Sequence, residues 1–152
     1  MHIPQRQVDF DRHLVETLAK NGPRYTSYPT ADRFHAGFNQ QHYQQALQQR
    51  NVGALNRPLS LYIHVPFCNT ICYYCGCNKI ITKDTSRADE YIEYLGRELD
   101  LIAPHLHGQH QLSQLHFGGG TPTFLNDEQL ARVFAHIKRH FEFTQRGEYS
   151  IE

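Results

Sequence analysis

Apolar residues recur at every second position in three short stretches of this 152-residue chain. In LSLYIHV (residues 59–65) the apolar side chains fall on one face, with Tyr62 and His64 on the other. Neighbouring side chains of a strand point to opposite faces, so this alternation predicts a strand. QLHF (114–117) and EYSIE (148–152) predict two further strands.

Spacings of three and four residues predict helices in the intervening segments. One helix is expected near residues 9–20, and a second, shorter one begins at Asn39. A long helix runs from about Ser86 and ends before Pro104. Another begins at Asn126, where the sequence has the form of a capping box.

The order strand, helix, strand, helix, strand predicts an α/β fold with a parallel sheet. A closed (β/α) barrel needs roughly 200–250 residues, so we expect the N-terminal part of a partial barrel from a longer protein. Residues 1–57 are expected to form N-terminal helices and an extended arm. Residues 58–152 are expected to form the first strand–helix units of the barrel, truncated inside the third strand.

Composition excludes several classes of function. Lys plus Arg equals Asp plus Glu, at 15 each, so no net charge favours nucleic acid or an acidic membrane surface. The first twenty residues contain no apolar run of the secretory type, and no stretch is long enough to span a bilayer. We therefore expect a cytoplasmic protein with no nucleic-acid or membrane partner.

The stretch CNTICYYCGC holds all four cysteines of the chain within ten residues. Disulfides are disfavoured by a reducing cytosol and by the very short loops they would close. Zinc stays open, although structural zinc sites usually use two separated pairs of ligands. An iron–sulfur cluster fits better, because C-x₃-C-x₂-C offers three thiolates on one loop. With only three ligands, one iron would keep an open coordination position.

The cysteine loop and the segment GGGTP together resemble the radical S-adenosylmethionine (SAM) superfamily. More narrowly, GPRYTSYPTA, PLSLYIHVPFC, CYYCGCNK, LHFGGGTPT and SIE closely resemble the oxygen-independent coproporphyrinogen III oxidase family, in the same order. The resemblance implies a radical SAM barrel and heme biosynthesis by oxidative decarboxylation of coproporphyrinogen III to protoporphyrinogen IX. It also implies a 4Fe–4S cluster and two SAM molecules as cofactors.

By this resemblance Cys68, Cys72 and Cys75 ligate the cluster, and Cys77 does not. The C-G-C ending that includes Cys77 is similar to that of the oxidases, whereas the related heme chaperones typically lack it. The residues implied to contact the cofactor are Tyr62, Gly119 and Glu152 for the cluster-bound SAM, Tyr74, Gly120 and Thr121 for the second, and Gly118 in the same glycine motif.

The resemblance further implies coproporphyrinogen III as substrate and an electron donor such as a flavodoxin-type reductant, and we expect a monomer. Arg24 and Arg33 could pair with the substrate's propionates, because guanidinium and carboxylate groups match in a fork geometry. A radical-SAM-like heme chaperone and a zinc-binding module remain as alternatives. The sequence leaves open whether such a fragment is active alone.

Overall fold

The computed structural model of the chain describes residues 10–19, 30, 33–49, 58–107 and 110–152. The chain divides into two compact units, Met1–Asn39 and Gln40–Glu152. The division between residues 57 and 58 that the sequence suggests stays a prediction.

Two short helices come before the sheet in the chain. In the first unit α1 (Arg12–Leu18) is capped by Asp11, whose carboxylate accepts a hydrogen bond from the backbone N–H of Leu14. None of its residues is buried, so its apolar stripe faces solvent. In the second unit α2 (Gln40–Gln49) begins directly after Asn39, as predicted. Within the described ranges, no helix is both long and apolar enough to cross a bilayer.

The second unit is built on a three-stranded parallel sheet in the order β1–β4–β5. The predicted strand at residues 59–65 is β1 (Leu59–Val65). The other two strands, β4 (Gln111–Gly119) and β5 (Glu142–Ile151), begin earlier than their apolar patterns indicate. All three predicted strands and their parallel arrangement are therefore confirmed.

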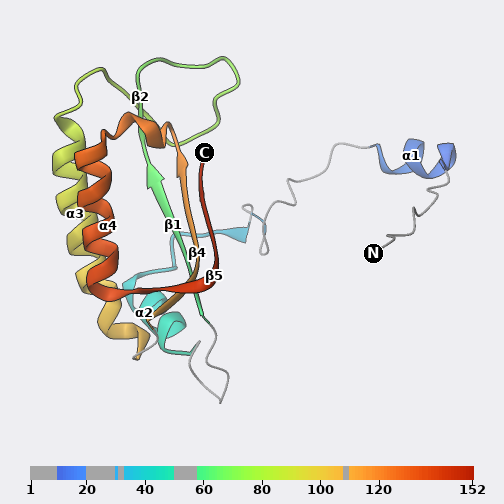
Figure 1. Cartoon of the computed structure of the whole chain (residues 1–152). Helices are drawn as coiled ribbons and strands as arrows, with labels where there is room; N and C mark the ends of the chain where they lie inside the picture. Colours follow the sequence, from blue (N-terminus) through green and yellow to red (C-terminus); the bar gives the residue numbers. More distant parts are fainter. Residues whose placement is uncertain (1–9, 20–29, 31–32, 50–57, 108–109) are drawn as a thin grey trace, which may run out of the picture. The chain divides into compact units, whose positions relative to one another are not determined.

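Both long helices lie on the same side of this sheet (Figure 1). They are α3 (Arg87–Ile102) and α4 (Asp127–His140), and each matches its sequence prediction closely. The hydrophobic core lies between helices and sheet and includes fully buried Ile92 and Ile137. The polar side chains that alternate with the core residues along each strand lie on the opposite side of the sheet. We call it the bare face, defined by Tyr62, His64, His116 and Ser150.

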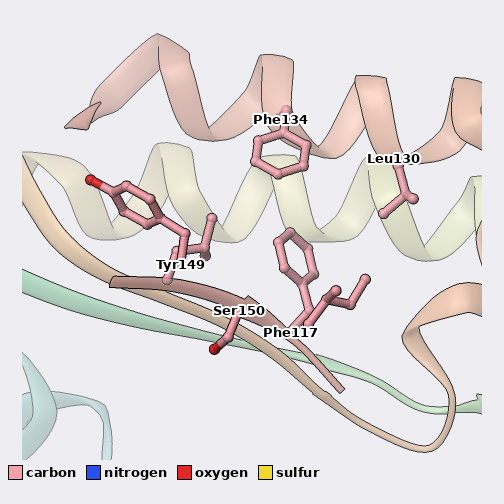
Figure 2. A pocket seen from close by; sticks show the side chains of 7 residues that line it. Phe117, Leu130, Phe134, Tyr149 and Ser150 are labelled. Atoms are coloured by element: carbon pink, nitrogen blue, oxygen red, sulfur yellow. The ribbon is translucent and has the colours of Figure 1, made fainter. Parts of the chain in front are cut away.

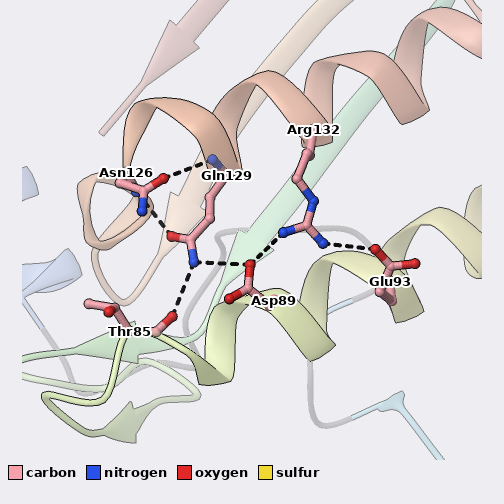
Figure 3. A network of polar contacts seen from close by, with 6 residues as sticks. All are labelled: Thr85, Asp89, Glu93, Asn126, Gln129 and Arg132. Atoms are coloured by element: carbon pink, nitrogen blue, oxygen red, sulfur yellow. Dashed lines mark hydrogen bonds and ion pairs between the residues drawn. The ribbon is translucent and has the colours of Figure 1, made fainter.

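A polar network joins the first turns of α3 and α4 (Figure 3). Asn126 caps α4 and forms the predicted capping box with Gln129. The Gln129 side chain also donates to the Thr85 carbonyl at 3.1 Å and to Asp89 at 3.3 Å. Asp89 in turn forms an ion pair with Arg132 of α4. These contacts fix the two helices at the end of the sheet where the cysteine loop begins.

Two very short strands form a second sheet that the sequence pattern does not indicate. β2 (Phe67–Cys68) follows β1 after Pro66 and pairs in parallel with β3 (Ile80–Ile81). Two 3₁₀ helices complete the unit, η2 (Ala103–Leu106) and η3 (Pro122–Phe124).

A hollow at the β5 edge of the main sheet is lined almost wholly by apolar side chains (Figure 2). Phe117, Tyr149, Leu130 and Phe134 face one another there, between the strands and α4. Ser150 points to the other side of its strand. The hollow has no thiol and no charged group among its lining residues, so the candidate chemistry lies elsewhere.

Candidate functional site

A row of polar side chains crosses the bare face near its carboxyl end. Strand register places Tyr62 of β1 beside His116 of β4, and His116 beside Ser150 of β5. The rings of Tyr62 and His116 stack with centroids 5.7 Å apart, and His116 Nδ1 lies 2.7 Å from Ser150 Oγ. The row thus connects all three strands through side chains at one level.

A second chain of hydrogen bonds runs from this row to the cysteine loop. His64 Nε2 lies 2.7 Å from the backbone oxygen of Asn78, which directly follows Cys77. Because a carbonyl can only accept, Nε2 carries the proton and Nδ1 is free to accept from the Tyr62 hydroxyl at 3.2 Å. The strand therefore holds the last part of the loop through His64.

The three glycines that end β4 each permit a close approach. A Cβ on Gly118 would lie 2.9 Å from the Tyr62 ring. Gly119 has a φ of +113°, a region that side-chain-bearing residues rarely adopt, and its position also abuts the His64 ring. A Cβ on Gly120 would lie 2.8 Å from Cys68 Sγ. The glycine run thus lets the Tyr62 and His64 rings and Cys68 pack directly against the backbone at the end of β4.

Backbone hydrogen bonds hold the base of the cysteine loop on both sides. Gly120 N–H donates to the Val65 carbonyl at 2.8 Å, and Thr121 N–H donates to the Phe67 carbonyl at 2.9 Å. On the other side, Thr82 N–H donates to the Cys68 carbonyl at 2.9 Å. The segment that carries Cys68 is therefore fixed between the glycine run and β3.

All four cysteines are free thiols. Cys68 and Cys75 are half-buried, whereas Cys72 and Cys77 are exposed. Cys68 Sγ accepts a hydrogen bond from the Thr121 hydroxyl at 3.5 Å. A hydrogen bond from the Cys77 backbone lowers the pKa of the Cys75 thiol, which favours its thiolate. Burial and the nearby Cys75 raise the pKa of the Cys77 thiol, so the predicted non-ligand is the less acidic of the two.

The donor set fits a polynuclear cluster. Among the described residues, no group of three or more His, Cys, Asp or Glu side chains is close enough to hold a metal ion. Thiolates are the standard protein ligands of iron–sulfur clusters. Three thiols on one loop, with a side-chain-free glycine beside Cys68, suit such a group.

Of the remaining predicted residues, Glu152 lies beside the bare face, Tyr74 on the cysteine loop and Arg33 in the first unit. Glu152 lies at the end of β5, where its N–H donates to the Phe117 carbonyl at 3.0 Å. Its carboxylate lies 3.7 Å from His116 Nε2, so it belongs to the bare-face group. Tyr74 is 100% exposed on the cysteine loop, away from any packed surface. Arg33 lies in the first unit, and Arg24 is outside the described residues.

Sequence comparison shows which known proteins this chain is similar to. No family model matches the sequence. The oxygen-independent coproporphyrinogen III oxidase of Escherichia coli is 46% identical over 97% of this chain and 31% of its own length. That of Mannheimia haemolytica is 39% identical over 96% of this chain and 97% of its own length. The chain belongs to the oxygen-independent coproporphyrinogen III oxidase family. It spans about a third of the length of the E. coli and Salmonella typhimurium relatives.

A solved structure supports the same family and confirms the fold prediction. The coproporphyrinogen III oxidase of E. coli, described as a radical SAM enzyme, superposes with a TM-score of 0.78 at 41% identity. The match covers 96% of this chain and 31% of that one. The parallel sheet with its two covering helices is thus the corresponding part of a radical SAM fold.

The sequence prediction missed three groups that the site uses: His116, Ser150 and the backbone carbonyl of Asn78. Alternation along β4 places His116 on the same face as Tyr62 once that strand is recognised. The register that brings it next to Tyr62 and Ser150 depends on tertiary structure, and no local signal encodes it.

Proposed function

We propose that this protein carries out the oxygen-independent oxidation of coproporphyrinogen III to protoporphyrinogen IX. In this reaction each of two propionate side chains becomes a vinyl group. It gives a hydrogen atom to the 5′-deoxyadenosyl group released from SAM, one electron to an electron acceptor, and carbon dioxide. The observation that carries the proposal is family membership combined with a cysteine loop fixed against a glycine run at the end of a parallel strand.

Cys68, Cys72 and Cys75 are the proposed ligands of a 4Fe–4S cluster. Their spacing on one loop supports this assignment, as does the lowered pKa of the Cys75 thiol. Three protein thiolates leave one iron available to a non-protein ligand, and an open position distinguishes a catalytic metal site from a closed one. When reduced, the bound cluster supplies the electron for cleavage of SAM. Cys77 is proposed to be outside the ligand set.

The proposed binding residues for two molecules of SAM come from the bare face, the glycine run and the cysteine loop: Tyr62, Tyr74, Gly118, Gly119, Gly120, Thr121 and Glu152. Tyr62, Gly119 and Glu152 would contact the cluster-bound molecule, and Gly118 adjoins the Tyr62 ring. Backbone groups of glycine can approach a ligand closely because no Cβ intervenes. The carboxylate of Glu152 can accept hydrogen bonds from ammonium or hydroxyl groups of the cofactor.

The second molecule of SAM is proposed to contact Gly120, Thr121 and Tyr74. Gly120 and Thr121 both adjoin Cys68, and the Thr121 hydroxyl donates a hydrogen bond to its sulfur at 3.5 Å. Tyr74 offers an aromatic face that is fully exposed and therefore accessible to an adenine ring. A ligand stacked on it would cover a side chain that otherwise has no burial.

The remaining partners follow from the same proposal. The substrate is coproporphyrinogen III, the electron donor is a flavodoxin-type reductant, and the protein acts as a cytoplasmic monomer. Balanced charge, at 15 basic and 15 acidic residues, supports the absence of a nucleic-acid partner. The heme-chaperone alternative is disfavoured by the C-G-C ending of the cysteine loop.

Anaerobic turnover tests this function. The protein is reconstituted with iron and sulfide, then incubated with coproporphyrinogen III, SAM and a reductant, and the porphyrins are separated by chromatography. We expect protoporphyrinogen IX from the unaltered protein and none from Cys68→Ser or Cys72→Ser. Stable haem binding without turnover would instead indicate a heme chaperone. Stoichiometric zinc bound to the protein in place of iron would indicate a zinc-binding module.

A further inference from the structure

His116 lies at the centre of the bare face, between two residues to which the proposed function gives cofactor contacts. Its ring stacks on Tyr62 with centroids 5.7 Å apart and an angle of 22° between the planes. Its Nε2 atom lies 3.7 Å from Glu152 Oε2. One imidazole therefore touches the neighbours on both adjoining strands.

The orientation of this ring is fixed from two sides. Ser150 Oγ lies 2.7 Å from Nδ1, so that nitrogen is engaged across the β4–β5 pair. The opposite nitrogen, Nε2, lies above Gly118, where a Cβ would come within 3.1 Å of it. The missing side chain of Gly118 leaves room for Nε2 to face the glycine run and Glu152.

We propose that His116 is a positioning residue that holds the Tyr62 ring and the Glu152 carboxylate in place for a single molecule of SAM. The inference deepens the proposed function and rests on it, because both neighbours matter here as cofactor contacts. His116 itself acts through these two side chains and holds no part of the cluster.

The energetic benefit is expected in binding and not in stability. The side chains of His116 and Glu152 are 41% and 80% exposed, and ion pairs between such exposed groups contribute little to folding. A carboxylate that is already oriented loses less conformational freedom when a ligand arrives. A bound ligand also excludes water, which strengthens the electrostatic contacts it makes.

Two substitutions separate the roles of the ring and its nitrogens. His116→Phe keeps an aromatic ring against Tyr62 but removes both nitrogens. His116→Gln loses the ring but places a side-chain amide near the position of Nε2. Affinity for SAM is measured by anaerobic equilibrium dialysis on reconstituted protein, alongside iron content and the thermal midpoint.

We expect His116→Phe to weaken SAM binding about tenfold, because the Glu152 carboxylate loses the polar group 3.7 Å away that helps to orient it. Iron content and the thermal midpoint should stay close to those of the unaltered protein. His116→Gln should bind more tightly than His116→Phe, because it restores a polar partner for the carboxylate. In a Glu152→Gln background the loss caused by His116→Phe should shrink.

Gln114→Leu is the matched control. Gln114 lies two residues earlier on the same face of β4, and its side chain donates to Glu148 of β5 at 3.1 Å. The substitution removes a similar polar contact between the same two strands, farther from the cysteine loop. SAM affinity should be unchanged in this variant.

Each unfavourable outcome has a distinct meaning. If the unaltered protein binds SAM and His116→Phe binds it equally well, the positioning role is wrong while the proposed function stands. A loss of iron in His116→Phe, or an equal loss of affinity in Gln114→Leu, also overturns the inference, since the effect would then be structural. If the unaltered protein holds a cluster but binds no SAM, the proposed function fails as well.

Discussion

The two faces of the main sheet are made by the same strands but differ in almost every physical property. Ile63, Val65 and Phe117 point toward α3 and α4 and are almost completely buried. Tyr62 and His116 alternate with them, face away from the helices and keep substantial exposure. The covered face provides the stability of the fold, whereas the bare face offers ordered polar groups to a ligand. Substitutions on the two faces should therefore change different observables.

The glycine run lies between the sheet and the cysteine loop. A substitution there should cause the largest loss of iron–sulfur cluster. A Cβ on Gly120 would lie 2.8 Å from Cys68 Sγ and 2.9 Å from the Phe67 carbonyl oxygen. Gly120→Ala must therefore displace the base of the cysteine loop. We expect most of the iron–sulfur absorbance to be lost after reconstitution.

Gly76→Ala is the control within the cysteine loop itself. No atom lies within 4 Å of where its Cβ would be placed, and its φ is not positive. Iron incorporation should match that of the unaltered protein. Equal iron content in Gly120→Ala and Gly76→Ala would show that the close approach at Gly120 does not shape the site.

Truncation on the covered face should reduce stability and leave the site's chemistry in place. Ile137 on α4 is fully buried in the core. Ile137→Ala removes buried methyl and methylene groups and leaves a cavity, which typically costs about 2–5 kcal/mol. On the bare face, Gln114→Ala removes an exposed contact and should cost at most about 0.5 kcal/mol. Urea unfolding measures both, and equal costs would contradict the division between the faces.

Close packing of the two helices gives a smaller and more specific effect. A Cβ on Gly96 of α3 would lie 2.5 Å from the His136 ring of α4. Gly96→Ala should destabilise the fold by about 1–3 kcal/mol through overpacking, despite the better helix propensity of alanine. In the Gly96→Ala/His136→Ala double variant the helices regain room, so the two effects should not add. Simple additivity in denaturant unfolding would contradict this contact.

The smallest predicted effect is a pH dependence at the far ends of the two helices. His140 Nε2 lies 2.6 Å from Asp100, and this hydrogen bond, with help from Arg139, lowers the pKa of the Asp100 carboxyl. A lowered pKa in the folded state gives stability above the ordinary pKa of Asp, about 3.9, which is lost as the pH falls through the folded value. The stability difference between the unaltered protein and Asp100→Asn should therefore stay constant from pH 6 to about pH 4 and shrink as the pH falls further. A stability difference that stays constant down to pH 3 would contradict the contact between His140 and Asp100.

The covered face could be predicted from sequence far better than the bare one. Spacings of two, three and four residues indicated β1, α3 and α4 almost to their ends, because burial on one side imposes a period. The early part of β5 escaped prediction because EFTQRG is polar. There the strand register shifts, and the Tyr149 hydroxyl lies 2.8 Å from the Thr144 carbonyl oxygen.

The candidate site divides in the same way. Its cysteines and glycines form short contiguous motifs, so sequence alone could single them out. His116 and Ser150 come together with Tyr62 only through strand register, and Asn78 contributes a backbone carbonyl that any residue would supply. Contacts between distant segments have no local periodicity, and these are the contacts that orient the site.

The central claim is that the cysteine loop holds a cluster with one iron open to SAM beside the bare face. EPR of the anaerobically reconstituted and reduced protein, recorded with and without SAM, tests it most directly. We predict a 4Fe–4S signal that shifts when SAM is added, in both the unaltered protein and Gln114→Leu. A cluster signal that ignores SAM, or stoichiometric zinc in place of iron, would contradict the account.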